Sequence, residues 1–352
     1  MGRFKELIER SHDRVPLPIA TYPAIALTGH SIKQLVTDAA LQSSAQLTLH
    51  RHLKSDVLFT CMDLSVEAEE FGATVRYSDA EVPSVVGRKV TSLDEIEALA
   101  QATPGHGRTA VYIDTVRRLR AASGECPILA GMIGPFSLAC RLFGVSECFL
   151  ATATEPEIVE SLLERTTQFL LAYANEYKRA GADGVFIAEP TAGLLSPKSL
   201  GTYSSPHIKR IIEGAEDDAF DIILHNCGAK SNHLGFLEES GASIFHFGAT
   251  MDIVAALQKL SAHAIVCGNL DPAAVFVQSS VAELRQKTIE LLGQTRAYPR
   301  FVPSSGCDVP AGTSLDHLQA FLDVVRREGS DGQGAGGPDF PMRTTTRCLT
   351  KS

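Results

Sequence analysis

The sequence lacks several features that would place it in a large class of proteins. The net charge of the 352 residues is −9 and no block of basic residues is present, which argues against binding to nucleic acid or to an anionic membrane. No apolar run approaches the roughly 18 to 20 residues of a membrane span. The opening stretch, MGRFKELIERSHDRVP, has no apolar signal-peptide region and instead predicts a short amphipathic helix.

Cofactor loops and disulfide patterns are also missing. The part of the chain before Gly329 contains neither GxxxxGK[ST] nor GxGxxG, so a cradle for nucleotide phosphates has no support. The eight cysteines include no CxxC pair and no dense cluster, which predicts a reducing, cytoplasmic location rather than a disulfide scaffold. Each cysteine is therefore expected, on its own, to be a small buried hydrophobe.

The C-terminal end differs in composition from the rest. From Gly329 the chain is rich in Gly, Ser and Thr and poor in apolar residues, a composition that cannot bury a core. We predict that residues 329–352 are a disordered tail and that residues 1–328 form a single domain.

Short apolar runs alternate with helical segments from about residue 125 onward, which is typical of a parallel sheet covered by helices. A doubly wound sheet and a (β/α)8 barrel both fit. Two earlier strand candidates complete a set of eight, which favours the α/β class with a (β/α)8 TIM barrel and an N-terminal helical extension. ATVRYSD predicts a short hairpin strand after the second barrel strand. The expected barrel strands are VPLPIA, SDVLFTCM, CPILAGMIG, GVFIAE, FDIILH, SIFHF, HAIVCG and RFVPSS.

Residues of metal-ligand type gather where these strands end, which is where parallel barrels build active sites. Residues two apart on a strand point to the same face, so His225 and Cys227 can aim into one space, and Cys307 follows the last strand. Two thiolates and an imidazole are a zinc set, and three protein ligands leave one position open for catalysis. The polar strand-end residues are Asp63, Glu189, His225, Cys227, His246, Cys267 and Cys307.

Each of these residues also has a structural interpretation. His225 alone fits a hydrogen-bonded strand end, and Cys227 alone fits core packing. His246 and Cys267 are rival ligands, although burial in apolar surroundings also explains them. Glu189 fits an acidic ligand or a general base, and equally a carboxylate that caps the next loop.

Six segments together resemble the uroporphyrinogen decarboxylase superfamily over roughly residues 15–328, and the resemblance implies its barrel fold. They are MDLSVEAEEFGATV, GPFSLA, ADGVFIAEPTAGLLSP, ILHNCG, CGNLDP and SSGCDVP. The decarboxylase branch needs no metal and uses an arginine-rich N-terminal segment, whereas the corresponding PIATYPAIALTGHS has no arginine. Asp63 matches that branch's catalytic aspartate by its spacing to Gly72.

The corrinoid-dependent methyltransferase branch, of the methylcobamide:coenzyme M type, fits better. Its pattern is HxC followed much later by Cys, which His225, Cys227 and Cys307 match in order, so the resemblance implies that these three bind Zn²⁺. It ranks Cys307 above Cys267 and His246. Glu189 stands where relatives often have Asp and is expected to be a fourth ligand or a base.

The resemblance also implies a reaction and partners. A zinc-bound small thiol, such as coenzyme M, would take the methyl group of a methyl-corrinoid (methylcobalamin type), and the cobalt would leave as Co(I). The corrinoid is expected on a separate carrier protein because this chain lacks the DxHxxG motif. A metal-free lyase, and a methyltransferase with another donor or acceptor, remain alternatives. The oligomeric state is left open, a homodimer being one option.

Overall fold

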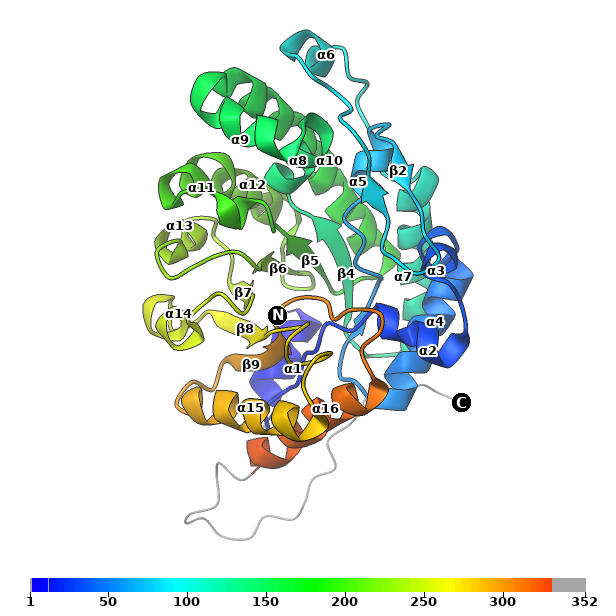
Figure 1. Ribbon diagram of the computed structural model, residues 1–352, viewed down its shortest axis with the longest axis vertical. Helices are drawn as coiled ribbons and strands as arrows, with labels where there is room; N and C mark the ends of the chain where they lie inside the picture. The colour runs from blue at the N-terminus through cyan, green and yellow to red at the C-terminus, as the bar shows by residue number, and fades with distance from the viewer. Residues whose placement is uncertain (1, 12, 331–352) are drawn as a thin grey trace.

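Apolar runs rich in Ile, Val, Leu and Phe form the strands at the centre of the molecule. In the computed structural model, which describes residues 2–11 and 13–330, these strands form one curled sheet with helices outside it (Figure 1). Every neighbouring pair is parallel, in the order β1-β4-β5-β6-β7-β8-β9. The strands are β1 (Leu58–Phe59), β4 (Ile128–Ile133), β5 (Gly184–Ala188), β6 (Asp221–Asn226), β7 (Ile244–Phe247), β8 (Ile265–Leu270) and β9 (Phe301–Ser305).

Helices cover the outside of the sheet, and the predicted TIM-barrel fold is confirmed. The helices are α1 (Arg3–Arg10), η1 (Tyr22–Ala24), α2 (Ile25–Thr28), α3 (Ile32–Thr37), α4 (Ala39–Leu53), α5 (Val66–Glu70), α6 (Leu93–Glu97), α7 (Gly107–Ser123), α8 (Pro135–Phe143), α9 (Val145–Thr154), α10 (Pro156–Ala180), η2 (Ala192–Leu194), α11 (Pro197–Tyr203), α12 (Ser205–Ala215), α13 (Leu234–Glu238), α14 (Ile253–Lys259), α15 (Val281–Gln294) and α16 (Leu315–Ser330). The hairpin predicted after β1 is present as β2 (Val75–Arg76) and β3 (Ser84–Val85).

Alternate strand residues divide between two apolar layers. One side of each strand packs against the helices. The other side fills the barrel interior, where Phe186 of β5, Ile223 of β6 and Val302 of β9 meet. The predicted N-terminal helix is α1, and its Phe4 and Ile8 join that interior cluster. The interior is therefore a packed core, and room for chemistry is left only above the strand ends.

The eighth strand position is filled by an extended segment, residues 15–20, which is not a regular strand. Leu17 N donates to the Pro303 carbonyl of β9 at 2.8 Å, and Ile19 N donates to Ser305 Oγ at 2.9 Å. The alternate positions, Pro16 and Pro18, have no N–H and cannot donate toward β1. The prediction of a regular strand at VPLPIA was therefore wrong, because this segment cannot complete a hydrogen-bonded ladder to β1. Leu17 and Ile19 nevertheless fill the barrel interior as the strand would.

The predicted single domain of residues 1–328 stays a prediction. Helix α16 continues to Ser330, so it passes the expected end at residue 328 by two residues. The remainder of the predicted tail, 331–352, lies outside the described residues. None of the helices among the described residues has both the length and the apolar character of a membrane span. Helices α8 and α9 reach the required length and apolar content only when they are counted together, and the chain bends by 106° between them.

Candidate metal centre

His225 lies near the carboxyl end of β6, two residues after Ile223, which points into the barrel, and Cys227 follows directly after the strand ends. Two glycines let the neighbouring loops close over them. A Cβ on Gly248, after β7, would lie 2.4 Å from the Cys227 carbonyl oxygen, and one on Gly306, after β9, would lie 2.8 Å from Ala249 N. Only glycine tolerates such close approaches of backbone to backbone. These two glycines therefore allow the loops after β6, β7 and β9 to meet above the interior.

The two thiols of this region interact. Hydrogen bonding with Cys307 holds the pKa of the Cys227 thiol well below its usual range, against the opposing effect of burial, and the His225 imidazole lowers it further. The same interaction raises the pKa of the Cys307 thiol. The pair therefore holds one thiolate readily, and a cation could stabilise a second. The structure thus brings together the three residues predicted as metal ligands.

His225 has an unusual hydrogen-bonding state for a buried ring. It is 2% exposed, and its Nε2 has no hydrogen-bond partner. The imidazole is close enough to the Cys227 sulfur to stabilise its thiolate. Its other nitrogen, Nδ1, lies 3.2 Å from the His246 carbonyl oxygen and 2.8 Å from His246 Nδ1. A buried, unpaired ring nitrogen is costly unless a ligand or ion uses it.

The donor set fits zinc in its chemistry but is not arranged as a closed cage. Two thiols and one imidazole are ligand types that zinc prefers, and an unpartnered Nε2 is an available donor. Across residues 2–11 and 13–330, however, no three His, Cys, Asp or Glu side chains already converge as a metal site. Binding would require the thiols to exchange their mutual hydrogen bond for the ion.

The rival ligands take different places. Cys267 of β8 points into the barrel core, and burial alone raises the pKa of its thiol. His246 lies between His225 and Ser304 Oγ, 2.8 Å from each. Burial lowers the pKa of His246 well below its usual range, so its ring is neutral. Neither of these residues acts on the Cys227 thiol as Cys307 and His225 do.

Glu189 lies on the helix side of the sheet. Its carboxylate accepts hydrogen bonds from Phe136 N at 2.9 Å, Ser137 N at 3.0 Å and Ser137 Oγ at 2.6 Å, all in the first turn of α8. Burial raises its pKa to about 7, and the bonds from Ser137 and Phe136 lower it in part. This is the geometry of a helix-capping carboxylate. Its expected role as a ligand or base remains a prediction.

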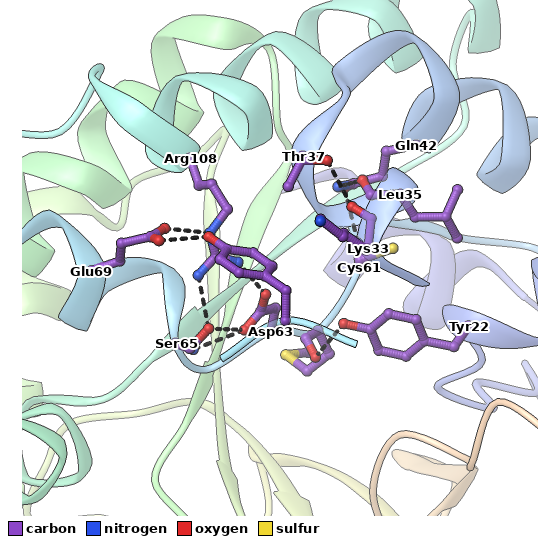
Figure 2. A network of polar contacts seen from close by, with 12 residues as sticks. Tyr22, Lys33, Leu35, Thr37, Gln42, Cys61, Asp63, Ser65, Glu69 and Arg108 are labelled. Carbon is purple, nitrogen blue, oxygen red and sulfur yellow. Dashed lines mark hydrogen bonds and ion pairs between the residues drawn. The ribbon is translucent and has the colours of Figure 1, made fainter. Parts of the chain in front are cut away.

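Asp63 lies beyond β1 in a compact polar network (Figure 2). It accepts from Ser65 N at 2.9 Å and Ser65 Oγ at 2.6 Å, and it forms an ion pair with Arg108. Arg108 also contacts Ser65 Oγ at 2.8 Å and Glu69, and its guanidinium lies 5.0 Å from the centre of the Tyr77 ring. Sequence reasoning missed Arg108 because α7 carries no motif. With its charge paired, Asp63 is poorly placed to act as a free base, so its predicted catalytic role stays untested.

Glu67, the second residue of α5, is a buried carboxyl group with one oxygen unpaired. Oε1 accepts from Ile133 N at 3.0 Å, whereas Oε2 has no partner. Burial raises its pKa to about 8, against the lowering effect of the Ile133 bond. The folded-state pKa thus exceeds the unfolded one, near 4.3. The neutral form is favoured, and stability is lost as the pH rises through the folded pKa.

We therefore expect Glu67→Gln, which mimics the protonated acid, to remove this pH dependence. Between pH 5 and pH 8.5 the parent should lose on the order of 3 kcal/mol more unfolding free energy than the variant. Urea unfolding of both proteins across that range measures the difference. Parallel pH profiles for the two proteins would contradict the assignment.

A model of the family described as Uroporphyrinogen decarboxylase (URO-D) matches residues 10–328. The chain is 27% identical over 335 residues to a methylcobamide:CoM methyltransferase of Methanosarcina acetivorans. The matched region covers 92% of this chain and 96% of that protein. It is 26% identical to a methylated-thiol–coenzyme M methyltransferase of Methanosarcina mazei, over 75% of this chain and 70% of that protein. A solved methyltransferase structure from Methanosarcina mazei superposes with a TM-score of 0.82 at 21% identity, covering 92% of this chain and 97% of that one.

Proposed function

The chain belongs to the uroporphyrinogen decarboxylase family, and on that premise we propose that it is a zinc-dependent methyltransferase. It would move a methyl group from a methyl-corrinoid, presented by a carrier protein, to a small thiol such as coenzyme M. Two relatives named as coenzyme M methyltransferases support the reaction type. The observation that carries the proposal is the unpartnered, buried Nε2 of His225 beside the Cys227–Cys307 thiol pair.

Each ligand has a distinct part in this proposal. His225 would bind through Nε2, and Cys227 and Cys307 would bind as thiolates. When bound, Zn²⁺ would deprotonate the substrate thiol and keep its sulfur nucleophilic at neutral pH. The packed barrel interior below His225 excludes water from that side. The substrate must therefore arrive from the loops above, which is also the face open to a protein partner.

The methyl transfer itself is simple to balance. The methyl carbon forms a bond to the substrate sulfur and breaks its bond to the corrinoid cobalt, which keeps the electron pair. The thiol proton leaves to solvent or to a nearby base. We assign Glu189 to holding the start of α8, because its carboxylate oxygens accept three hydrogen bonds there. The substrate thiol would then take the position on Zn²⁺ that the three protein ligands leave open.

The direct test combines metal analysis with a thiol screen. Protein purified without chelators is expected to retain one zinc per chain and to demethylate methylcobalamin with coenzyme M or another small thiol. Zinc-bound protein that is inactive with every thiol in the screen would overturn the acceptor assignment. Folded protein that holds no zinc would overturn the zinc mechanism and favour a metal-free lyase.

A further inference from the structure

A chain of hydrogen bonds runs from His225 through the barrel interior to the N-terminal segment. His246 Nδ1 lies 2.8 Å from His225 Nδ1, and His246 Nε2 lies 2.8 Å from Ser304 Oγ. Ser304 Oγ in turn can donate its one proton to either of two carbonyl oxygens, those of Leu17 and Ser305. His225, His246 and Ser304 are each no more than 2% exposed.

The direction in which protons are donated along this series of hydrogen bonds is fixed at both ends, because a carbonyl oxygen can only accept. At one end the His246 carbonyl lies 3.2 Å from His225 Nδ1, so that nitrogen carries the proton. His246 Nδ1 must then be the acceptor in the 2.8 Å contact, since two N–H groups cannot face each other. At the other end Ser304 gives its only proton to a carbonyl, so its oxygen accepts from His246 Nε2–H. Both ends require the same direction.

We propose that His246 and Ser304 are positioning residues that fix the proton of His225 on Nδ1 and so present its unprotonated Nε2 to the metal. The inference rests on the proposed zinc function and deepens it. His246, which the sequence left as a rival ligand, acts through His225 instead. Zinc-binding histidines commonly donate their second N–H to a fixed acceptor, which orients the ring and raises its basicity.

A neutral imidazole, that of His246, suits a zinc site whose ligands include two cysteines. Two cysteinates already balance the charge of Zn²⁺, and a third thiolate would arrive with the substrate. A carboxylate behind His225 would add further negative charge, whereas the imidazole and hydroxyl chain adds none. The hydrogen bonds from His246 and Ser304 thereby orient His225 without repelling the anionic sulfur of the substrate.

Matched substitutions at position 246 separate hydrogen bonding from packing. His246→Leu removes the side-chain acceptor at 2.8 Å, leaves only the longer 3.2 Å contact from His225 Nδ1 to the backbone carbonyl, and keeps most of the volume. His246→Asn keeps a side-chain oxygen that can accept from His225 Nδ1. His246→Leu should weaken zinc binding about 10- to 100-fold, measured by competition with a chelator. His246→Asn should stay closer to the parent than to His246→Leu, and Ser304→Ala should fall between the parent and His246→Leu. Equal zinc affinity in the parent and His246→Leu would overturn the proposal.

A second readout needs neither zinc nor activity. Long-range proton–nitrogen correlation spectra of the metal-free, histidine-labelled parent at pH 8 report which ring nitrogen carries the proton. His225 is expected to be protonated on Nδ1 and His246 on Nε2. A His225 ring without a proton on Nδ1 would overturn the proposed positioning role of His246 and Ser304. A parent that binds no zinc but shows these two protonation sites would sink the proposed function while leaving the hydrogen-bond chain intact.

Discussion

Cys307→Ser is expected to abolish stoichiometric zinc and to lower thiol methylation by at least about 10²-fold, because a free thiol is only a few per cent thiolate at pH 7. The Cys307 thiol is the principal partner of Cys227 in the candidate centre. A serine hydroxyl of similar size is a much poorer zinc ligand than a thiolate. Metal analysis and methylcobalamin assays on the purified variant measure both losses.

Cys267→Ala provides the matched control for this substitution. Cys267 is fully buried in the barrel interior, on the strand β8 that pairs with β9, the strand leading to Cys307. Its loss should cost some stability through a small cavity. Zinc content and thiol methylation should nevertheless match the parent. Zinc lost from Cys267→Ala and retained by Cys307→Ser would reverse the choice between the two cysteines.

Arg108→Met is expected to lower the unfolding free energy by about 3–5 kcal/mol, the usual cost of leaving one partner of a buried ion pair uncompensated. Arg108 is 6% exposed and Asp63 is 4% exposed. Arg108 is also bonded to Ser65 and Glu69 (Figure 2). Methionine keeps the length of the side chain, so the loss reports the charge and hydrogen bonds rather than the volume. Urea unfolding near pH 7 measures it.

Adding Asp63→Asn to Arg108→Met tests the cause of that loss. The neutral amide removes the stranded charge and can still accept from Ser65, so the double variant should be more stable than Arg108→Met alone. A double-mutant cycle gives the coupling between the two side chains. A loss below about 1 kcal/mol in Arg108→Met would mean that solvent already screens the pair, as it does at exposed sites.

The fold could be predicted from the sequence because its strands are short apolar runs separated by helical periodicity. That pattern located all seven paired strands, and the ATVRYSD prediction located β2 of the hairpin but not β3. It failed at residues 15–20, where Pro16 and Pro18 remove the donors that a ladder to β1 would need. The side chains of Leu17 and Ile19 still pack inward, because side-chain alternation depends on extended backbone and not on a completed ladder.

The candidate centre was only partly readable from the sequence. The two-residue spacing of His225 and Cys227 predicts a shared face, but the proximity of Cys307 depends on barrel curvature and on the close loop contacts at Gly248 and Gly306. Glu189 at a strand end looked equally suited to a metal or to a cap. Only the three-dimensional position of the α8 N-terminus distinguishes these, since it lies far away in sequence.

Zinc-edge X-ray absorption on the purified protein, with and without a thiol substrate, tests the central claim most directly. It counts the sulfur and nitrogen atoms bound to the metal. Two sulfur ligands and one imidazole are predicted for the protein alone, from Cys227, Cys307 and His225, rising to three sulfurs when coenzyme M is added. A zinc site with one sulfur or none, or a sulfur count that the thiol leaves unchanged, would contradict the account.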